Sequence, residues 1–527
     1  MTGIALTNAT ILDGTGASSY IGDVLVEAGR ITDITSSGQV RASTILDCTG
    51  LLLTPGFIDI HSHSDLTLLL DPRAASAIYQ GVTLEVIGNC GHGCAPLQAP
   101  GLARDAMYGP IPDESFFTWS TMAGYLDQLE SARPAVNVVA LVPNGQLRLS
   151  HVGPEQRAAT PAELEAMARE LAGALDDGAF GFSTGLEYPR ERDAATEEID
   201  HLCRVVASRR GLYATHTRNR DRSAIAAIDE AIGTARRTGV RLQISHITPR
   251  GPASDTELAL ARAGSAASEG IDIGFDMHTR LFGYTHLKNL VPLGVLAGSR
   301  SDILRRLAEP STVELVNSHP NLISGVGDWS RVVLSDSAMS AELNGQSFAE
   351  IARQCGCSPI AAAIKILMSD VDNLERPMVL LKTYSEDVLR TTYQSSSCMI
   401  GSDAATLAPD GILAGATFHG AYTWASWFIR RMVRELGAVT LTDAIYRLTG
   451  LPAQRLCLAD RGRIAVGCRA DIAVMDFKTY ADAGTVDTPS RLATGMRHVL
   501  VNGVVTMLNG AQTNRRAGVV LRASRLG

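Results

Sequence analysis

Six residues of metal-binding types stand directly after short apolar segments of this sequence: His61, His63, Cys90, His216, His246 and Asp403. Along a β-strand, residues i and i+2 face the same side, so the imidazoles of His61 and His63 can reach one metal ion. A lone histidine at a strand end is more often a structural residue. Core packing does not explain the whole set, which therefore predicts a metal site.

The residue types favour zinc and a hydrolytic reaction. Imidazole and thiolate are preferred zinc ligands, and a catalytic zinc site keeps one position open for water. Zinc lowers the pKa of bound water toward neutrality. A neighbouring carboxylate can take the water proton and deliver it to a leaving nitrogen, and Asp403 suits that role. The alternative interpretation of Asp403 is a helix N-cap, which Ala404 and Ala405 permit but do not favour.

The elements that must position these residues alternate along the middle of the chain. Short apolar segments are separated by helical stretches such as 161–177, 223–238 and 349–369. The apolar segments span residues 57–61, 82–88, 137–142, 179–183, 212–217, 241–246, 271–276 and 398–403. Eight such strands with helices between them predict an α/β fold, a parallel (β/α)8 TIM barrel, whose catalytic residues lie where strands end and loops begin.

Both ends of the chain differ from the middle. Residues 1–55 show a pattern of short strands and tight turns, including a hairpin signal over 23–34. Residues 460–527 show the same pattern of short strands and turns. We expect these ends to build one small β-sandwich domain beside a barrel over 56–459. Residues 280–346 fit the barrel poorly and predict an insertion. Residues 91–119, rich in glycine and proline, predict a long loop over the barrel mouth.

Composition excludes several classes of protein. The chain has 527 residues, 45% of them hydrophobic, and a formal net charge of −8, with no basic run. This argues against disorder and against nucleic acid or an anionic membrane as partner, and favours a small-molecule substrate. No stretch of 18 apolar residues is present. Nine scattered cysteines predict reduced thiols and a cytoplasmic protein, and homo-oligomerisation is left open.

Several distinct motifs are spread along nearly the whole chain. They lie in residues 54–63, 81–83, 88–91, 182–189, 215–219, 243–246, 385–388, 399–403, 460–464, 470–472 and 501–522. Together they resemble the amidohydrolase superfamily, and within it the N-acyl-D-amino-acid deacylase (D-aminoacylase) family. The Gly88-Asn89-Cys90-Gly91 element separates this family from other amidohydrolases.

The resemblance implies roles for the six residues. Cys90, His216 and His246 would hold one zinc ion tightly, and His61 and His63 would form a second, weaker position. Asp403 would join the metal site as general base and then general acid. A barrel with a flanking β-sandwich is also implied. Many relatives bridge two metals with a carboxylated lysine on strand 4, but no lysine precedes Lys288 here, which excludes that design.

The predicted substrate contacts depart from the family pattern. Tyr188 matches a family position in the substrate pocket, and Glu187 beside it is a second candidate. His278 either lines the pocket or bonds to backbone. The usual lysine two residues after the strand 6 histidine is replaced by Thr248, and the usual downstream His-Pro-Arg is absent from 409–413.

Two explanations of these departures stay open. Arg280, at the end of strand 7, is absent from the family pattern and could hold a substrate carboxylate. Arg190, Arg192 or Arg218 could do the same, because a guanidinium suits bidentate binding of a carboxylate. Alternatively, the substrate lacks a free α-carboxylate.

The expected function is zinc-dependent hydrolysis of the amide bond of an N-acyl-D-amino acid or related N-acyl compound. One alternative is an amidohydrolase acting on a cyclic amide, a lactone, or a xenobiotic amide or ester. A remote alternative is a non-catalytic scaffold that kept the fold.

Overall fold

The computed structural model describes residues 3–38, 40, 42–98, 106–108, 110–318, 321–485 and 488–523. Its centre is an eight-stranded sheet in which every printed strand pair is parallel, in the order β16-β12-β11-β10-β9-β8-β7-β6. The strands are β6 (Phe57–Asp59), β7 (Val82–Ile87), β8 (Asn137–Pro143), β9 (Gly181–Gly185), β10 (Leu212–His216), β11 (Arg241–Ile244), β12 (Ile273–His278) and β16 (Cys398–Gly401). The predicted α/β barrel fold is confirmed.

The sheet closes between its first and last strands. The Asp403 amide donates to the His61 carbonyl at 2.8 Å, and the His63 amide donates to the Ala404 carbonyl at 2.9 Å. Ser62 and Ala404 form a parallel bridge. These bonds lie just beyond β6 and β16, so closure itself brings Asp403 beside His61 and His63.

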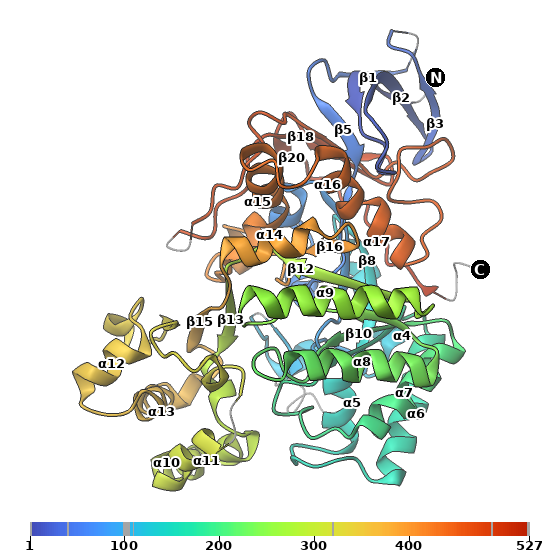
Figure 1. Cartoon of the computed structure of the whole chain (residues 1–527). Helices are drawn as coiled ribbons and strands as arrows, with labels where there is room; N and C mark the ends of the chain where they lie inside the picture. The colour runs from blue at the N-terminus through green and yellow to red at the C-terminus, as the bar shows by residue number, and fades with distance from the viewer. Residues whose placement is uncertain are drawn as a thin grey trace.

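Helices cover the outside of the barrel (Figure 1). They are α1 (Thr67–Leu70), α2 (Ala75–Ile78), α4 (Met122–Ala132), α5 (Asn144–His151), α6 (Pro161–Asp176), α7 (Thr196–Ser208), α8 (Ala224–Thr238), α9 (Ala253–Ser268), α14 (Glu386–Gln394), α15 (His419–Trp427), α16 (Leu441–Leu448) and α17 (Gly450–Arg455). α6 shows why they form here, because Thr160 and Glu163 make a capping box around Pro161. α8 buries Ala224, Ile228 and Ala231 at helical spacing.

The two chain ends pair in one nine-stranded sheet, with the path β20-β19-β18-β17-β5-β1-β2-β3 and β4 attached to β1. Figure 1 shows the early and late strands side by side above the barrel. The strands are β1 (Ile4–Ile11), β2 (Tyr20–Glu27), β3 (Arg30–Thr35), β4 (Thr44–Asp47), β5 (Leu52–Pro55), β17 (Ile472–Met475), β18 (Met496–Val501), β19 (Val504–Leu508) and β20 (Ala511–Gln512). The hairpin expected over 23–34 is the antiparallel pair β2–β3. The boundaries of a terminal domain stay a prediction.

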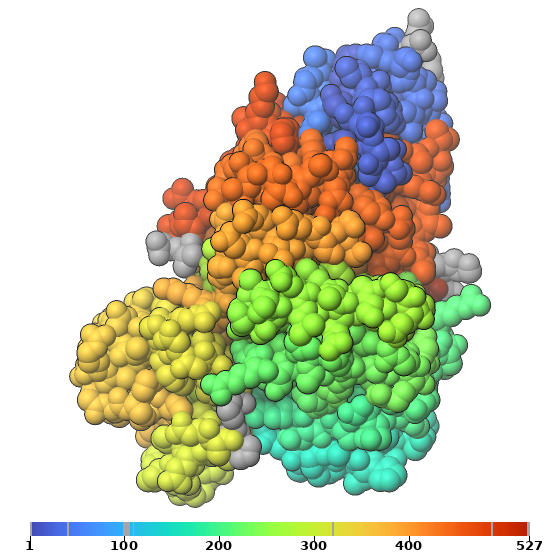
Figure 2. Space-filling model, in the orientation of Figure 1, coloured from blue at the N-terminus to red at the C-terminus, as the bar shows by residue number. Residues whose placement is uncertain are grey.

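Between β12 and β16 the chain leaves the barrel. It builds a three-stranded antiparallel sheet of β13 (Phe282–His286), β15 (Met378–Lys382) and β14 (Val332–Asp336). Helices α10 (Arg300–Ala308), α11 (Pro310–Ser318), α12 (Phe348–Cys355) and α13 (Pro359–Ser369) pack beside it and form a lobe in Figure 2. The sheet reaches past residue 346 because β15 is its central strand. The helical stretch 349–369 is split, since Gly356 turns with a φ of 61° and Pro359 starts a new helix.

Two further sequence expectations concern the chain as a whole. None of the described helices combines the length and apolarity needed to span a bilayer. All nine cysteines are free thiols. The expected mouth loop at 91–119 lies partly outside the described residues, at 99–105 and 109.

Candidate metal centre and active site

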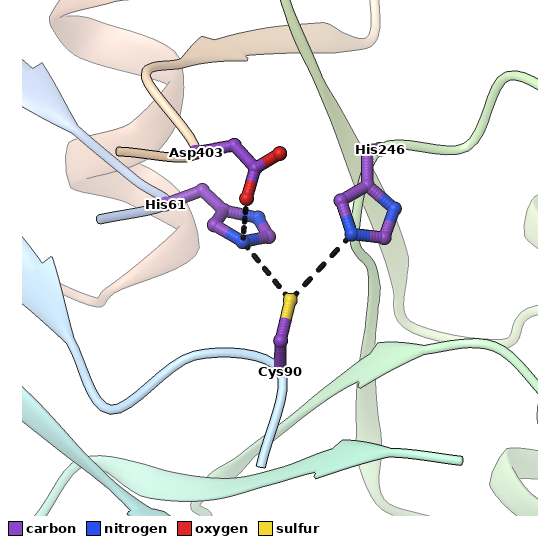
Figure 3. Close-up of side chains that lie close together, drawn as sticks. All are labelled: His61, Cys90, His246 and Asp403. Atoms are coloured by element: carbon purple, nitrogen blue, oxygen red, sulfur yellow. Dashed lines mark hydrogen bonds and ion pairs between the residues drawn. The ribbon is translucent and has the colours of Figure 1, made fainter. Parts of the chain in front are cut away.

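Four side chains from four strand ends converge at the mouth of the barrel (Figure 3). The ligand atoms of His61, Cys90, His246 and Asp403 all lie within 4.8 Å of one another. Cys90 Sγ is 3.2 Å from His61 Nε2 and 3.5 Å from His246 Nε2. His61 Nε2 is 3.5 Å from Asp403 Oδ1. Four potential ligands at such spacing can surround a single ion.

Sharp backbone turns aim three of these side chains at the centre. Cys90, His246 and Asp403 adopt positive φ angles of 54°, 37° and 46°. Non-glycine residues seldom take this conformation, and such strain is found mainly at functional sites. Each turn follows a barrel strand, so the side chain leaves the strand direction and faces the mouth.

Asp276 on β12 fixes the orientation of His61. Its Oδ1 lies 3.0 Å from His61 Nδ1 and accepts the His246 amide at 2.9 Å, while Oδ2 accepts from Gln243 at 2.8 Å. A carboxylate at Nδ1 keeps the proton there and leaves the lone pair of Nε2 for a metal. One buried carboxylate thus positions two of the four central residues.

Glu187 plays the same part for His216. Its Oε2 lies 2.7 Å from His216 Nε2, and its Oε1 accepts from Arg250. His216 Nδ1 is therefore left with its lone pair, and it is buried without a hydrogen-bond partner among the described residues. The ring of His216 lies 4.5 Å from the ring of His246, centroid to centroid. His216 is outside the tightest group of four, but its free nitrogen is next to that group.

The protonation of the site fits a metal ion. Burial lowers the pKa of His216 to about 4 and that of His246 well below its ordinary value. These imidazoles are neutral at pH 7 and can donate lone pairs. Burial raises the pKa of the Cys90 thiol although His61 lies beside it, so a cation is needed to hold the thiolate. Imidazole and thiolate donors suit zinc, and the unpaired buried Nδ1 of His216 is what a ligand without its ion would show.

Asp403 is held at both carboxylate oxygens. Oδ1 lies 3.2 Å from His63 Nε2, and Oδ2 lies 2.8 Å from Arg280 Nη2. Burial raises the pKa of Asp403, but Arg280, His63 and His61 outweigh it and hold this pKa well below its ordinary value. The carboxylate is ionised at neutral pH, as a general base must be.

A cavity of about 800 Å³ opens beside the centre. Tyr188, His278 and Arg280 line it, together with His63, His216, His246 and Asp403. The guanidinium of Arg280, which was expected to meet a substrate carboxylate, pairs with Asp403 and donates to the Ser402 carbonyl.

Two other predicted substrate contacts do not line the cavity. Glu187 lies behind His216, as described above. Arg218 pairs with Glu230 and donates to the Arg192 carbonyl. Both side chains therefore serve the framework around the site, and neither is placed to meet a substrate in the cavity.

The structure adds residues that sequence reasoning did not single out. Asp276 is the last residue of the expected strand 271–276, and nothing in the sequence links it to His61. Tyr108, from the described part of the mouth loop, lines the cavity with its ring 4.8 Å from His63. Arg220 and Tyr384 line it as well. The proximity of Arg220 to His216 in the sequence was an available signal.

Comparison with known proteins extends these observations. An amidohydrolase family model matches residues 44–295 and 329–507. The chain is 32% identical to an N-acyl-D-glutamate deacylase of Alcaligenes xylosoxydans xylosoxydans, over 98% of this chain and 96% of that protein.

Solved structures show the same likeness. One is a D-aminoacylase (TM-score 0.81, 28% identity), and another is the Bordetella bronchiseptica N-acyl-D-glutamate deacylase bound to zinc and a phosphonate mimic of the tetrahedral intermediate (TM-score 0.80, 30% identity). Each similarity covers 98% of this chain and 99% of the other.

Proposed function

Because this chain belongs to the amidohydrolase family, we propose that it cleaves the amide bond of an N-acyl-D-amino acid or a close N-acyl compound. The chain is a metal-dependent amide hydrolase, as the family and the relatives of known activity indicate. The proposal concerns the substrate class and the role of each residue.

One observation carries the proposal. His61, Cys90, His246 and Asp403 converge within 4.8 Å at the edge of a cavity of about 800 Å³. That volume is in the usual range for small-molecule sites. The cavity is large enough for an acylated amino acid and brings it against both the ligand set and an ionised carboxylate.

We assign the metal to Cys90, His216 and His246, with His61 and His63 forming a second, weaker position. A bound zinc ion supplies Lewis acidity, which polarises a carbonyl and lowers the pKa of a water molecule. Glu187 and Asp276 hold His216 and His61 in the tautomers that leave the inner nitrogens free.

Asp403 carries out the proton transfers in this proposal. Its carboxylate takes a proton from the attacking water and later donates it to the leaving nitrogen, so the products are a carboxylic acid and a free amine. Arg280 holds Oδ2, so Oδ1, on the side of His61 and His63, is the oxygen that exchanges the proton.

A panel of N-acetyl-D- and N-acetyl-L-amino acids, assayed for released amine, tests the proposal. We expect zinc-loaded protein to release amine from the D-series, and chelation followed by added zinc to remove and restore this activity. No release from any member of the panel would contradict the deacylase assignment. A protein without zinc that added metal does not activate would instead support the scaffold alternative.

The cytoplasmic location is part of this proposal, and the nine free thiols support it, because a reducing compartment keeps cysteines unpaired. We expect no nucleic-acid or membrane partner. Homo-oligomerisation is left open.

A further inference from the structure

Among the described residues, the cavity wall carries one arginine that forms no ion pair. Four arginines line the cavity: Arg220, Arg250, Arg280 and Arg376. Arg250 pairs with Glu187 and Asp221, Arg280 with Asp403, and Arg376 with Asp336. Within the described part of the chain, no carboxylate oxygen lies within 4.0 Å of the guanidinium nitrogens of Arg220. Arg220 is nevertheless buried, with only 7% of its surface exposed. Glu187 is near enough for Arg220 to help lower its pKa, but it is paired with Arg250 and does not contact Arg220. A buried cation at a cavity wall with no carboxylate in contact is a natural place for an anionic ligand group.

Only one nitrogen of Arg220 is used to hold its side chain. Nη2 donates to the carbonyls of His246 at 2.7 Å and Thr248 at 3.2 Å, and to the Tyr384 hydroxyl. The guanidinium carbon lies 5.9 Å from the centre of the Tyr384 ring. This arrangement fixes the plane of the guanidinium before any ligand binds.

The remaining donors of Arg220 are available. Nε and Nη1 make no hydrogen bond with any described residue, yet neither is among the fully buried unpaired atoms. They are therefore accessible from the cavity that Arg220 lines. Nε and Nη1 point to different sides of the guanidinium, and each can donate a charge-assisted hydrogen bond to a carboxylate oxygen.

The position of Arg220 indicates which carboxylate it meets. It is bonded to the backbone of His246, whose side chain belongs to the metal centre. In an N-acyl amino acid, a single carbon separates the α-carboxylate from the scissile nitrogen. A cation for this group must lie next to the metal centre, as Arg220 does.

We propose that Arg220 binds the α-carboxylate of the substrate and makes the enzyme select N-acyl amino acids over their neutral analogues. This inference rests on the proposed function and deepens it. It also replaces Arg280 as the expected carboxylate partner, because the charge of Arg280 is already balanced by Asp403.

The test compares each N-acetyl-D-amino acid with its carboxamide, which has the same size without the charge. Wild-type enzyme should prefer the acid in kcat/KM by about 100-fold, because a charge-assisted pair inside a cavity is strong. R220M should lose about 100-fold in kcat/KM on the acid, mainly through KM, and less than about 3-fold on the carboxamide. R220K, which keeps the positive charge without the planar guanidinium, should have a kcat/KM on the acid between those of the wild type and R220M. Its partial activity would separate lost charge from lost geometry.

R376M is the matched control, since Arg376 also lines the cavity but is paired with Asp336 and half exposed. It should keep the acid preference of the wild type. Zinc content and thermal unfolding of R220M show whether loss of the anchor to His246 disturbs the metal centre.

Two results would overturn the inference while the proposed function stands. One is equal loss by R220M on acid and carboxamide, and the other is a wild type without preference for the acid. The second result needs no variant, so it decides even if R220M fails to fold. A zinc-loaded wild type that cleaves no N-acyl amino acid overturns the proposed function itself, and this inference with it.

Discussion

Asp403 illustrates how neighbours decide the use of a single side chain. β12 and β16 are adjacent strands, so Arg280, two residues past the end of β12, reaches Asp403 beyond the end of β16. The pair keeps the carboxylate ionised and anchors one of its oxygens. We therefore propose Arg280 as a positioning residue for the base, whereas the sequence suggested a contact with substrate.

The first prediction concerns Asp403→Asn. Turnover should fall by about 100- to 10,000-fold, because the amide cannot exchange the proton. Zinc content should stay near that of the wild type, since the thiol and imidazole donors remain. Amine release and metal analysis measure the two effects.

Asp410→Asn is the control for this substitution, because Asp410 is exposed and pairs with Arg73 at the surface. Its turnover should be unchanged. Activity of Asp403→Asn within about 3-fold of wild type would contradict the proton-transfer role.

The second prediction concerns Cys90→Ala. Cys90 is the only thiol in the tight group, so its loss should lower the affinity for zinc by at least about 10- to 100-fold. Even residues that only hydrogen-bond to metal ligands contribute this much to affinity. Cys94→Ala is the control, because Cys94 is buried four residues away but outside the group. Zinc retained by Cys90→Ala, or lost equally by both variants, would argue against this ligand role.

At the scale of elements, the turns after the strands are as important as the strands. Alternation of apolar segments and helices predicts the eight strands, and each lies within a few residues of its expected place. The stretch 349–369 shows the limit of this approach, because one helical pattern covers two helices joined at Gly356. The positive φ angles at Cys90, His246 and Asp403 carry no sequence signal of their own.

The third prediction concerns Gly91→Ala, in the turn that presents Cys90. Gly91 has a φ of 68°, and an added Cβ would lie 1.9 Å from Glu191 Oε1 and 2.8 Å from the Gly185 amide nitrogen. We expect the free energy of unfolding to fall by about 1–3 kcal/mol or more, because both strain and a clash oppose the change. Activity should fall as well, since Cys90 must shift.

Gly239→Ala separates the two costs. Gly239 has a similar φ of 71° at the end of α8, but nothing lies within 4 Å of its added Cβ. It should lose only about 1 kcal/mol, from the backbone alone, and keep full activity. Chemical denaturation of both variants measures the difference, and equal losses would show that the clash has no effect.

At the scale of the whole molecule, one buried aspartate joins the terminal sheet to the barrel. Asp471, just before β17, accepts from Asn137 of β8 at 3.1 Å and from the Asn502 amide at 2.7 Å. It also pairs with Arg461, which is buried too. The barrel floor and the C-terminal part of the terminal sheet therefore meet at one carboxylate.

The fourth prediction concerns Asp471→Asn. Removing one partner of a buried ion pair leaves the other charge uncompensated, so we expect the free energy of unfolding to fall by about 3–5 kcal/mol. Asp460→Asn is the control, because Asp460 pairs with Arg30 at the surface, where such a pair contributes about 0–1 kcal/mol. Urea denaturation of zinc-loaded protein compares them. Equal losses would exclude this joint as a major support.

The sequence alone determined the barrel, the shared sheet of the chain ends and the family, because these depend on apolar periodicity and on short motifs along the chain. It also supplied the ligand types, since strand ends in a parallel barrel must meet at one mouth. Only the tertiary structure decided which charges face each other. Asp276 meets His61 across 215 positions of the sequence, and Arg280 meets Asp403 across 123. Arg220 has no ion pair with any residue that the structure describes. Strand order and barrel closure set these neighbours, and the reach of a long arginine depends on packing around it, which no local pattern encodes.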